Sequence, residues 1–259
     1  MILTFYKYQG TGNDFVMVDN RQNIFPKNNT KLVARLCDRK FGIGADGLIL
    51  LENSKSADFK MVYFNADGNT STMCGNGGRC LVAFAEYLGI ISNRASFEAI
   101  DGLHEATIEN DSINLKMINV DTINQFDDHL FLDTGSPHHV TFVDTIKNVN
   151  VKISGRKIRY GAPYFESGSN VNFVEKIDEN TFKVRTYERG VEDETLSCGT
   201  GVTAVAIASH KAKKTKNTTV IIETPGGMLE VSFDFDNNTY KNVFLKGAAT
   251  LVFKGEIQI

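Results

Sequence analysis

The sequence predicts a mixed α/β (α+β) protein of two pseudo-symmetric halves, each a curved, mostly antiparallel sheet or barrel around a central buried helix. Three observations predict this fold. The pattern Cys-Gly-x-Gly occurs at Cys74 and again at Cys198, 124 residues later in a chain of 259. Short segments of alternating apolar and polar residues, typical of strands, surround both copies. The helical stretch after each copy is apolar on almost every side, as expected for a helix buried all round.

Further landmarks recur at nearly the same offset, which a chance pair of dipeptides would not produce. The matching landmarks are Tyr63 and Tyr187, each eleven residues before its cysteine, 98–105 and 223–230 downstream, and 11–16 and 134–140 upstream. Landmarks repeated in the same order indicate an internal duplication. The length also suits two halves of ordinary domain size. We therefore expect an N-terminal half over 1–118 and a C-terminal half over 119–249, with the strand near 250–259 free to return to the first half.

Each predicted element follows from its hydrophobic period. Period-2 alternation predicts strands at 2–8, 14–19, 47–52, 58–64, 96–109 and 113–118, and in the second half at 139–144, 170–175, 181–187, 219–233 and 240–253. Helical spacing predicts helices at 30–40, 76–88, 151–160 and 200–214. The segment 119–130 fits neither period and is interpreted as the crossing between the halves.

Composition excludes several classes of protein. With 42% apolar and 23% charged residues and a net charge of −3, the chain is globular rather than disordered, and no nucleic-acid or membrane partner is expected. No apolar run is long enough to span a bilayer, and the N-terminus lacks a signal-peptide pattern. We therefore expect a cytoplasmic protein with reduced cysteines. The spacing of its four cysteines fits no zinc pattern, so no metal site is expected.

The two repeated cysteines are candidate acid/base groups. Glycines at the start of a helix let a ligand reach backbone N–H groups that have no intrahelical partner, and a carboxylate suits such a site. The same helix end stabilises a thiolate. Inversion of a carbon centre requires a base on one face and an acid on the other, and two equivalent thiols supply both. The alternative for each cysteine alone is a buried structural residue.

Motifs along essentially the whole chain resemble those of the diaminopimelate epimerase family. They are Gly10-Thr-Gly-Asn13-Asp14-Phe15-Val16, Gly42-Ile-Gly-Ala-Asp46, Phe64-Asn65-Ala-Asp-Gly68, Met73-Cys74-Gly-Asn-Gly-Gly-Arg79-Cys80, Pro137-His138, Asn170-Val-Asn172-Phe173, Tyr187-Glu188-Arg189-Gly190 and Glu194-Thr-x-x-Cys198-Gly199-Thr200-Gly201. The resemblance implies cofactor-independent interconversion of LL- and meso-diaminopimelate for lysine and peptidoglycan. It also implies an active site in a cleft between two α/β halves, and a homodimer.

The resemblance also implies roles for particular residues. Cys74 and Cys198 are the expected acid/base pair, and His138 and Glu188 are expected to tune their pKa values. The expected substrate-binding residues are Asn13, Asn65, Gly75, Asn76, Asn172, Glu188, Arg189, Gly199 and Thr200. Among them, the backbone of Gly75, Asn76, Gly199 and Thr200 would hold the reacting carboxylate, and Asn65, Asn172 and Arg189 would read the distal amino-acid group. The planar guanidinium of Arg189 suits a carboxylate.

Two positions depart from the family pattern. Gly47 stands where many members have glutamine, and Ser136 stands where they have asparagine. Both family residues contact substrate, so the reaction type is a firmer prediction than the substrate. Three alternatives stay open: a racemase or epimerase of another amino acid, like proline racemase or the phenazine-pathway isomerase; a catalytically silent binding module; and a redox switch built on Cys74 and Cys198.

Overall fold

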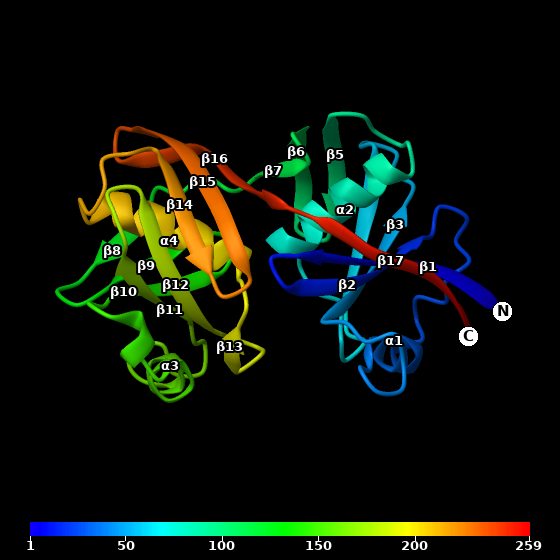
Figure 1. The fold of residues 1–259 in the computed structure, drawn as a ribbon, viewed down its shortest axis with the longest axis horizontal. Coiled ribbons are helices and arrows are strands. Elements are labelled where there is room, and N and C mark those ends of the chain that lie inside the picture. Colours follow the sequence, from blue (N-terminus) through cyan, green and yellow to red (C-terminus); the bar gives the residue numbers. More distant parts are fainter. The chain divides into compact units, whose positions relative to one another are not determined.

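The computed structural model describes residues 1–259, which divide into two compact units, each of mixed α+β structure (Figure 1). Unit 1 comprises Met1–Leu115 and Gly247–Ile259, and unit 2 comprises Lys116–Lys246. The chain therefore passes from one unit to the other twice. None of the α-helices is both long and apolar enough to cross a membrane.

Unit 1 is built from strands joined mostly as antiparallel neighbours. Its elements are β1 (Ile2–Gly10), β2 (Asn13–Asp19), α1 (Thr30–Cys37), β3 (Gly47–Glu52), β4 (Phe59–Asn65), α2 (Gly75–Tyr87), β5 (Arg94–Ala99), β6 (Gly102–Glu109), β7 (Ser112–Lys116) and β17 (Thr250–Gln258). The pairs β2–β3 and β4–β5 are parallel, and the chain between the members of each pair contains a helix. Parallel neighbours need such a crossover connection, which explains the positions of α1 and α2.

Unit 2 contains a second set of elements. They are β8 (Ile123–Gln125), β9 (Leu130–Asp133), β10 (Pro137–Phe142), the 3-10 helix η1 (Ile146–Asn148), α3 (Val151–Tyr160), β11 (Asn170–Lys176), β12 (Thr181–Glu188), β13 (Asp193–Thr195), α4 (Gly199–Lys211), β14 (Thr219–Thr224), β15 (Gly227–Asp236) and β16 (Thr239–Ala248). Here β10–β11 and β12–β14 are the parallel pairs, and the other strand pairs are antiparallel.

The order of strand pairings is the same in both units, so the duplication predicted from sequence is confirmed. In unit 1 each strand from β1 to β6 pairs with the next one along the chain. These six successive pairs are antiparallel, parallel, antiparallel, parallel, antiparallel and antiparallel. The series β9, β10, β11, β12, β14, β15 and β16 repeats it. The register repeats too, since Phe15 lies opposite Gly47 and His139 lies opposite Val171. The strand added beside β1 is β17, and beside β9 it is β8.

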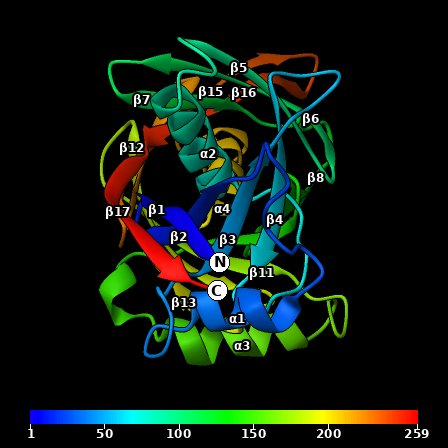
Figure 2. The same cartoon turned by 90° about the vertical axis from the view of Figure 1, so that its right-hand side faces the viewer.

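Each unit surrounds one helix with its sheet, as the apolar sequences of these helices predict. Helix α2 packs against β1, β2, β3, β6 and β17, and α4 packs against β9, β10, β11, β12, β14 and β15. Because these strands come from distant positions in the strand order, each sheet curls around its helix (Figure 2). In α4 every residue from Gly201 to Ser209 is buried. Helix α1 covers the other face of its sheet, so all six residues of β3 are buried.

The boundaries of several elements differ from the predicted ones. The predicted strands at 96–109 and 219–233 are hairpins, with turns at 100–101 and 225–226, and the one at 240–253 is divided between β16 and β17. The alternation of apolar and polar residues continues through a two-residue turn, so the hydrophobic period alone does not reveal the turn. Helix α1 ends at Cys37 instead of residue 40, because the Asp38 side chain accepts hydrogen bonds from the following Lys40 and Phe41 amides. The crossing segment 119–130 contains β8, and β9, β13 and η1 were also missed because each spans four residues or fewer.

Candidate functional site

Cys74 is the N-cap residue of α2, a helix of 13 residues, so its thiol lies at the helix end where backbone N–H groups have no intrahelical acceptor. Its Sγ donates to Asn13 Oδ1 at 3.6 Å, and Asn76 Nδ2 donates to the same oxygen at 3.3 Å. Asn13 lies at the start of β2, next to the turn that links β1 and β2. The structure therefore brings together three of the residues predicted for the first half, Cys74, Asn13 and Asn76, around one amide oxygen.

The amide of Asn13 is held by a charged cluster. Its Nδ2 donates to Asp46 Oδ2 at 2.7 Å, and Arg39 bridges Asp46 and Asp14 with two contacts of 2.7 Å. Lys7 forms an ion pair with Asp14 at 2.6 Å. Burial opposes ionisation of Asp14, but hydrogen bonds from Arg39 and Lys7 outweigh it and lower the pKa of Asp14 to about 2. Asp14 is therefore ionised at neutral pH, and the cluster anchors Asn13 from the side away from the thiol.

Arg79 is a functional candidate that sequence reasoning missed. It lies one turn into α2 and is fully buried, and its Nη2 donates to Asn76 Oδ1 at 3.1 Å and to Thr11 Oγ1 at 2.8 Å. Burial lowers the pKa of Arg79, and no carboxylate is among the groups that oppose this shift. Arg79 and Asp46 both belong to motifs of the family, which was the available sequence signal. Their contacts, however, depend on the fold and cannot be read from the motifs.

Cys198 occupies the equivalent position in unit 2, as the N-cap residue of α4, which also has 13 residues. Its Sγ lies 3.5 Å from Thr200 Oγ1, and Thr200 Oγ1 lies 2.9 Å from His138 Nε2. Thr134 Oγ1 donates to the Thr200 carbonyl oxygen at 2.8 Å, which ties the start of α4 to the segment before β10. Three predicted residues, Cys198, Thr200 and His138, therefore form one hydrogen-bonded series.

His138 is fully buried on β10 and is neutral at physiological pH. Burial, with a further contribution from the positive charge of Arg189, lowers the pKa of His138 to about 3. Its Nδ1 lies 3.1 Å from Asn172 Nδ2. Asn172 is also fully buried; its Nδ2 donates to the His139 carbonyl oxygen at 3.1 Å, and its Oδ1 accepts from Thr186 Oγ1 at 3.0 Å. Every polar atom of the Asn172 amide thus has a partner within unit 2.

The remaining predicted residues lie at strand ends. Asn65 ends β4 and is exposed, in a turn where Gly68 donates to its carbonyl oxygen. Glu188 ends β12 and accepts a hydrogen bond from Thr195 at 2.9 Å. Arg189 follows it and is exposed; its Nη1 donates to the Ser167 carbonyl oxygen at 2.9 Å. The backbones of Gly75 and Gly199 form the first residues of α2 and α4.

The two departures from the family pattern have structural explanations. A Cβ atom at Gly47 would lie 2.5 Å from Tyr63 Cε2 and 2.7 Å from the Phe64 carbonyl oxygen, so no side chain fits there. Ser136 Oγ accepts a hydrogen bond from Asn170 Nδ2 at 2.9 Å. The tyrosine ring therefore fills the space beside Gly47, and the serine hydroxyl is engaged by a neighbouring strand.

The other two cysteines are core residues, as predicted. Cys37 and Cys80 are 3% and 0% exposed, and burial raises the pKa of each thiol to about 12. None of the four cysteines forms a disulfide. No cluster of three or more His, Cys, Asp or Glu side chains has the arrangement to hold a metal ion. Only Cys74 and Cys198 combine partial exposure with a helix N-terminus.

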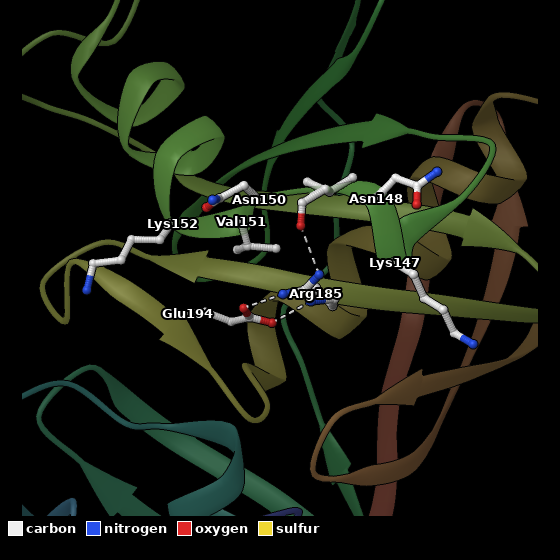
Figure 3. Close-up of a pocket in the computed structure, with 8 residues that line it drawn as sticks. Lys147, Asn148, Asn150, Val151, Lys152, Arg185 and Glu194 are labelled. Carbon is white, nitrogen blue, oxygen red and sulfur yellow. Dashed lines mark hydrogen bonds and ion pairs between the residues drawn. The ribbon is translucent and has the colours of Figure 1, made fainter.

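A separate depression of about 430 Å³ lies in unit 2, between η1, the start of α3 and β12 (Figure 3). At its floor Arg185 forms a two-pronged ion pair with Glu194, with both contacts at 2.6 Å, and donates to the Val149 carbonyl oxygen at 3.0 Å. None of the predicted site residues lines it. Arg185 is therefore already paired with a carboxylate inside this depression.

Comparison with known proteins agrees with the motifs. The family model described as diaminopimelate epimerase matches residues 5–123 and 130–252. A relative from Flavobacterium psychrophilum, named diaminopimelate epimerase, is 62% identical over 253 residues, which cover 97% of this chain and 99% of the relative.

Two solved structures share the fold at low identity. A PhzF-family phenazine biosynthesis protein from Bacillus anthracis superposes over 100% of both chains with a TM-score of 0.80 at 14% identity. A hydroxyproline epimerase from Agrobacterium vitis, covering 99% of this chain and 92% of its own, has a TM-score of 0.70 at 13% identity. The fold is thus common to several enzymes, whereas sequence identity across nearly the whole length separates one family from the others. This chain belongs to the diaminopimelate epimerase family.

Proposed function

We propose that this protein is an isomerase that interconverts LL- and meso-diaminopimelate by moving protons between the substrate α-carbon and two thiols, Cys74 and Cys198. The observation that carries the proposal is the repeated N-cap cysteine on two buried helices of a chain that belongs to this family. One sulfur removes the α-proton, and the other delivers a proton to the opposite face. No cofactor takes part.

The two helix starts supply the electrostatic part of the mechanism. The N–H groups of Gly75 and Asn76 in α2, and of Gly199 and Thr200 in α4, belong to first turns whose amides have no intrahelical acceptor. They hold the carboxylate next to the reacting carbon and stabilise the negative charge that develops when the α-proton leaves. This stabilisation is required because a positioned acid or base by itself contributes only about 10²- to 10⁴-fold.

The distal amino-acid group of the substrate is read by Asn65 and Arg189, and not by Asn172, because the Asn172 amide is fully buried and each of its polar atoms has a partner. Arg189 is exposed at the end of β12, where its guanidinium can exchange the Ser167 carbonyl oxygen for a carboxylate. Glu188, next to it, binds the substrate and adjusts the thiols together with His138. Asn172 acts indirectly, because its buried amide holds the His138 ring in place.

The product is a precursor for the synthesis of lysine and of peptidoglycan. We also propose a homodimer located in the cytoplasm, on the basis of the family resemblance alone. Sedimentation of the purified protein tests the dimer.

The direct test of the proposal is turnover of both epimers. Purified protein is incubated with LL- or meso-diaminopimelate, and the isomers are separated by chiral chromatography, with L-proline and trans-4-hydroxy-L-proline as comparison substrates. We expect both epimers of diaminopimelate to reach the same equilibrium mixture and the proline compounds to remain unchanged. Cys74→Ala and Cys198→Ala should each lose about 10²- to 10⁴-fold in rate. Absence of turnover with both diaminopimelate epimers contradicts the proposal.

A further inference from the structure

The buried charge of Arg79 has no counter-charge in the protein. None of the Arg79 surface is exposed, and no carboxylate lies close enough to stabilise the charge. Arginine keeps its proton in proteins, so the guanidinium stays charged although burial opposes it. Its Nη2 donates to Thr11 Oγ1 at 2.8 Å and to Asn76 Oδ1 at 3.1 Å, but its Nε has no hydrogen-bond partner. Burying a charge without a counter-charge is unfavourable, so packing alone does not explain this residue.

The repeat shows that the position does not need a charge to hold its helix. Arg79 is the fifth residue of α2, and the fifth residue of α4 is Thr203. Thr203 is also fully buried, and its Oγ1 donates to the Gly199 carbonyl oxygen at 3.0 Å. In α2 the corresponding contact joins Arg79 Nη1 to the Gly75 carbonyl oxygen at 3.5 Å. Both copies therefore keep a donor beside the carbonyl group of the first helical residue, but in unit 1 this donor is a cation.

This carbonyl group belongs to the peptide whose N–H lies at the open end of the helix. The Gly75 carbonyl oxygen and the Asn76 N–H are the two ends of one peptide group in the first turn of α2. A hydrogen bond to the oxygen polarises such a group and makes its N–H a stronger donor, and a charged donor acts more strongly than a neutral one. Arg79 therefore strengthens an N–H that, in the proposed function, holds the substrate carboxylate.

Arg79 also joins the start of α2 to the turn between β1 and β2. Its hydrogen bond to Asn76 Oδ1 directs the NH₂ group of Asn76 toward Asn13, whose Oδ1 lies 3.3 Å away. Its hydrogen bond to Thr11 holds a residue with a φ of 55°, in the left-handed region. A residue other than glycine keeps such a conformation only where its surroundings hold it. One guanidinium thus positions both segments that lie beside the helix end.

We propose that Arg79 is a positioning residue of the epimerase site, whose buried charge polarises the Gly75–Asn76 peptide and stabilises the anion held at the start of α2. This inference rests on the proposed function and adds to it a residue that does not touch the substrate. The carboxylate gains negative charge as the α-proton leaves, so the stabilisation is greater in the transition state than in the bound substrate. Loss of the charge therefore lowers kcat more than it raises KM.

Substitutions of Arg79 separate its charge from its packing. Arg79→Met removes the charge and fills most of the volume, whereas Arg79→Lys keeps the charge. We expect Arg79→Met to lose about 10²-fold in kcat, as for removal of one donor to a developing anion. Its thermal midpoint should stay near that of wild type, because no carboxylate is left unpaired. Arg79→Lys should recover most of the lost kcat.

Arg185→Met is the matched control, because it removes an arginine that does have a carboxylate partner. Glu194 would lose both of its contacts of 2.6 Å with Arg185. We therefore expect this variant to lower the thermal midpoint and to leave kcat unchanged in the folded protein. The two arginines should thus give opposite results, with a loss of activity at one and a loss of stability at the other.

Chemical rescue tests the charge within a single variant. Arg79→Ala leaves a buried space, and such spaces bind small molecules of matching shape. Guanidinium and urea are both planar and similar in size, but only guanidinium is charged. Each is added at millimolar concentration, below the range that unfolds the protein and at matched ionic strength. We expect guanidinium to raise kcat and urea to leave it unchanged.

Three results would overturn the role of the charge. They are wild-type kcat in Arg79→Met, equal kcat in Arg79→Met and Arg79→Lys, and equal rescue by urea and guanidinium. Failure of Arg79→Met to fold would assign Arg79 to the fold and would also overturn the proposal. If Arg79→Ala does not fold, the comparison of the Met and Lys variants decides. Absence of epimerisation by the wild type contradicts the proposed function, whereas an active wild type with an equally active Arg79→Met contradicts this inference alone.

Discussion

Gly77 and Gly201 are equivalent in the repeat, each the third residue of its buried helix, yet replacing them by alanine should have different effects. A Cβ atom at Gly201 would lie 2.7 Å from Asn172 Oδ1 and 3.3 Å from both Cys198 Cβ and His138 Cε1. Asn172 cannot turn away, because it is fully buried and its amide has partners on both sides. At Gly77 the nearest atoms are the flexible end of Ile49, at 3.0 Å, and two other apolar side chains.

The expected size of the effect follows from these contacts. Normal contact starts near 3.4 Å, so in Gly201→Ala the start of α4 must move by about 0.7 Å. Overpacking of this kind costs about 1–3 kcal/mol, and the better helix propensity of alanine offsets about 1 kcal/mol. We therefore expect a loss of up to about 2 kcal/mol in the free energy of unfolding. The same movement shifts Cys198 and Thr200 relative to His138, and a displacement approaching 1 Å lowers kcat/KM by about 10²-fold.

The assay compares the two variants with the wild type by urea denaturation and by steady-state epimerisation of LL-diaminopimelate. For Gly77→Ala we expect the free energy of unfolding to stay within about 1 kcal/mol of wild type, because Ile49 can move its terminal methyl group. Equal activity losses in the two variants, or full activity in Gly201→Ala, would refute the reasoning from the contacts of Asn172 and His138.

Three further predictions address other parts of the structure. Arg189→Ala should raise KM for diaminopimelate at least tenfold with intact folding, measured by steady-state kinetics and circular dichroism; an unchanged KM would remove Arg189 from the distal group. Gly47→Ala should lower the free energy of unfolding by about 1–3 kcal/mol in urea because its Cβ would overlap Tyr63, and an unaffected midpoint would show that the ring moves freely. Asp14 has a pKa of about 2 when folded, against 3.8 as the ordinary value, so its contribution to stability is complete above pH ~4 and disappears as pH falls toward ~2. Asp14→Asn should flatten the pH dependence of thermal unfolding in that interval, and an unchanged slope would contradict the ion-pair explanation.

The helices and the cysteine positions were predictable because each depends on a local pattern. The predicted helix at 200–214 carries apolar residues on all sides, which predicted burial on all sides. The structure places α4 inside its sheet. The Cys-Gly-x-Gly pattern predicted the helix starts to within one residue of α2 and α4. The duplication was also visible in sequence, because both copies kept the glycines and tyrosines that close packing requires.

Side-chain partners over long separations were beyond the sequence. Asn13 meets Asp46 across 33 residues and Cys74 across 61, and nothing in the local pattern indicates which amide end faces the sulfur. The burial of Asn172 and its use as a support for His138 were hidden for the same reason. Arg79 was overlooked because arginine is rarely buried without a carboxylate, so its place in an apolar helix gave no familiar signal.

Deuterium labelling over the first turnover tests the two-thiol mechanism most directly. Wild-type protein in deuterated water receives unlabelled LL- or meso-diaminopimelate, and both isomers are isolated at less than about one tenth of the approach to equilibrium. With one thiol removing the proton and the other delivering one from solvent, the product isomer should carry deuterium at its α-carbon and the recovered substrate should carry almost none. Unlabelled product, or equal early labelling of recovered substrate and product, would show that a single group exchanges the proton and would contradict the paired roles of Cys74 and Cys198.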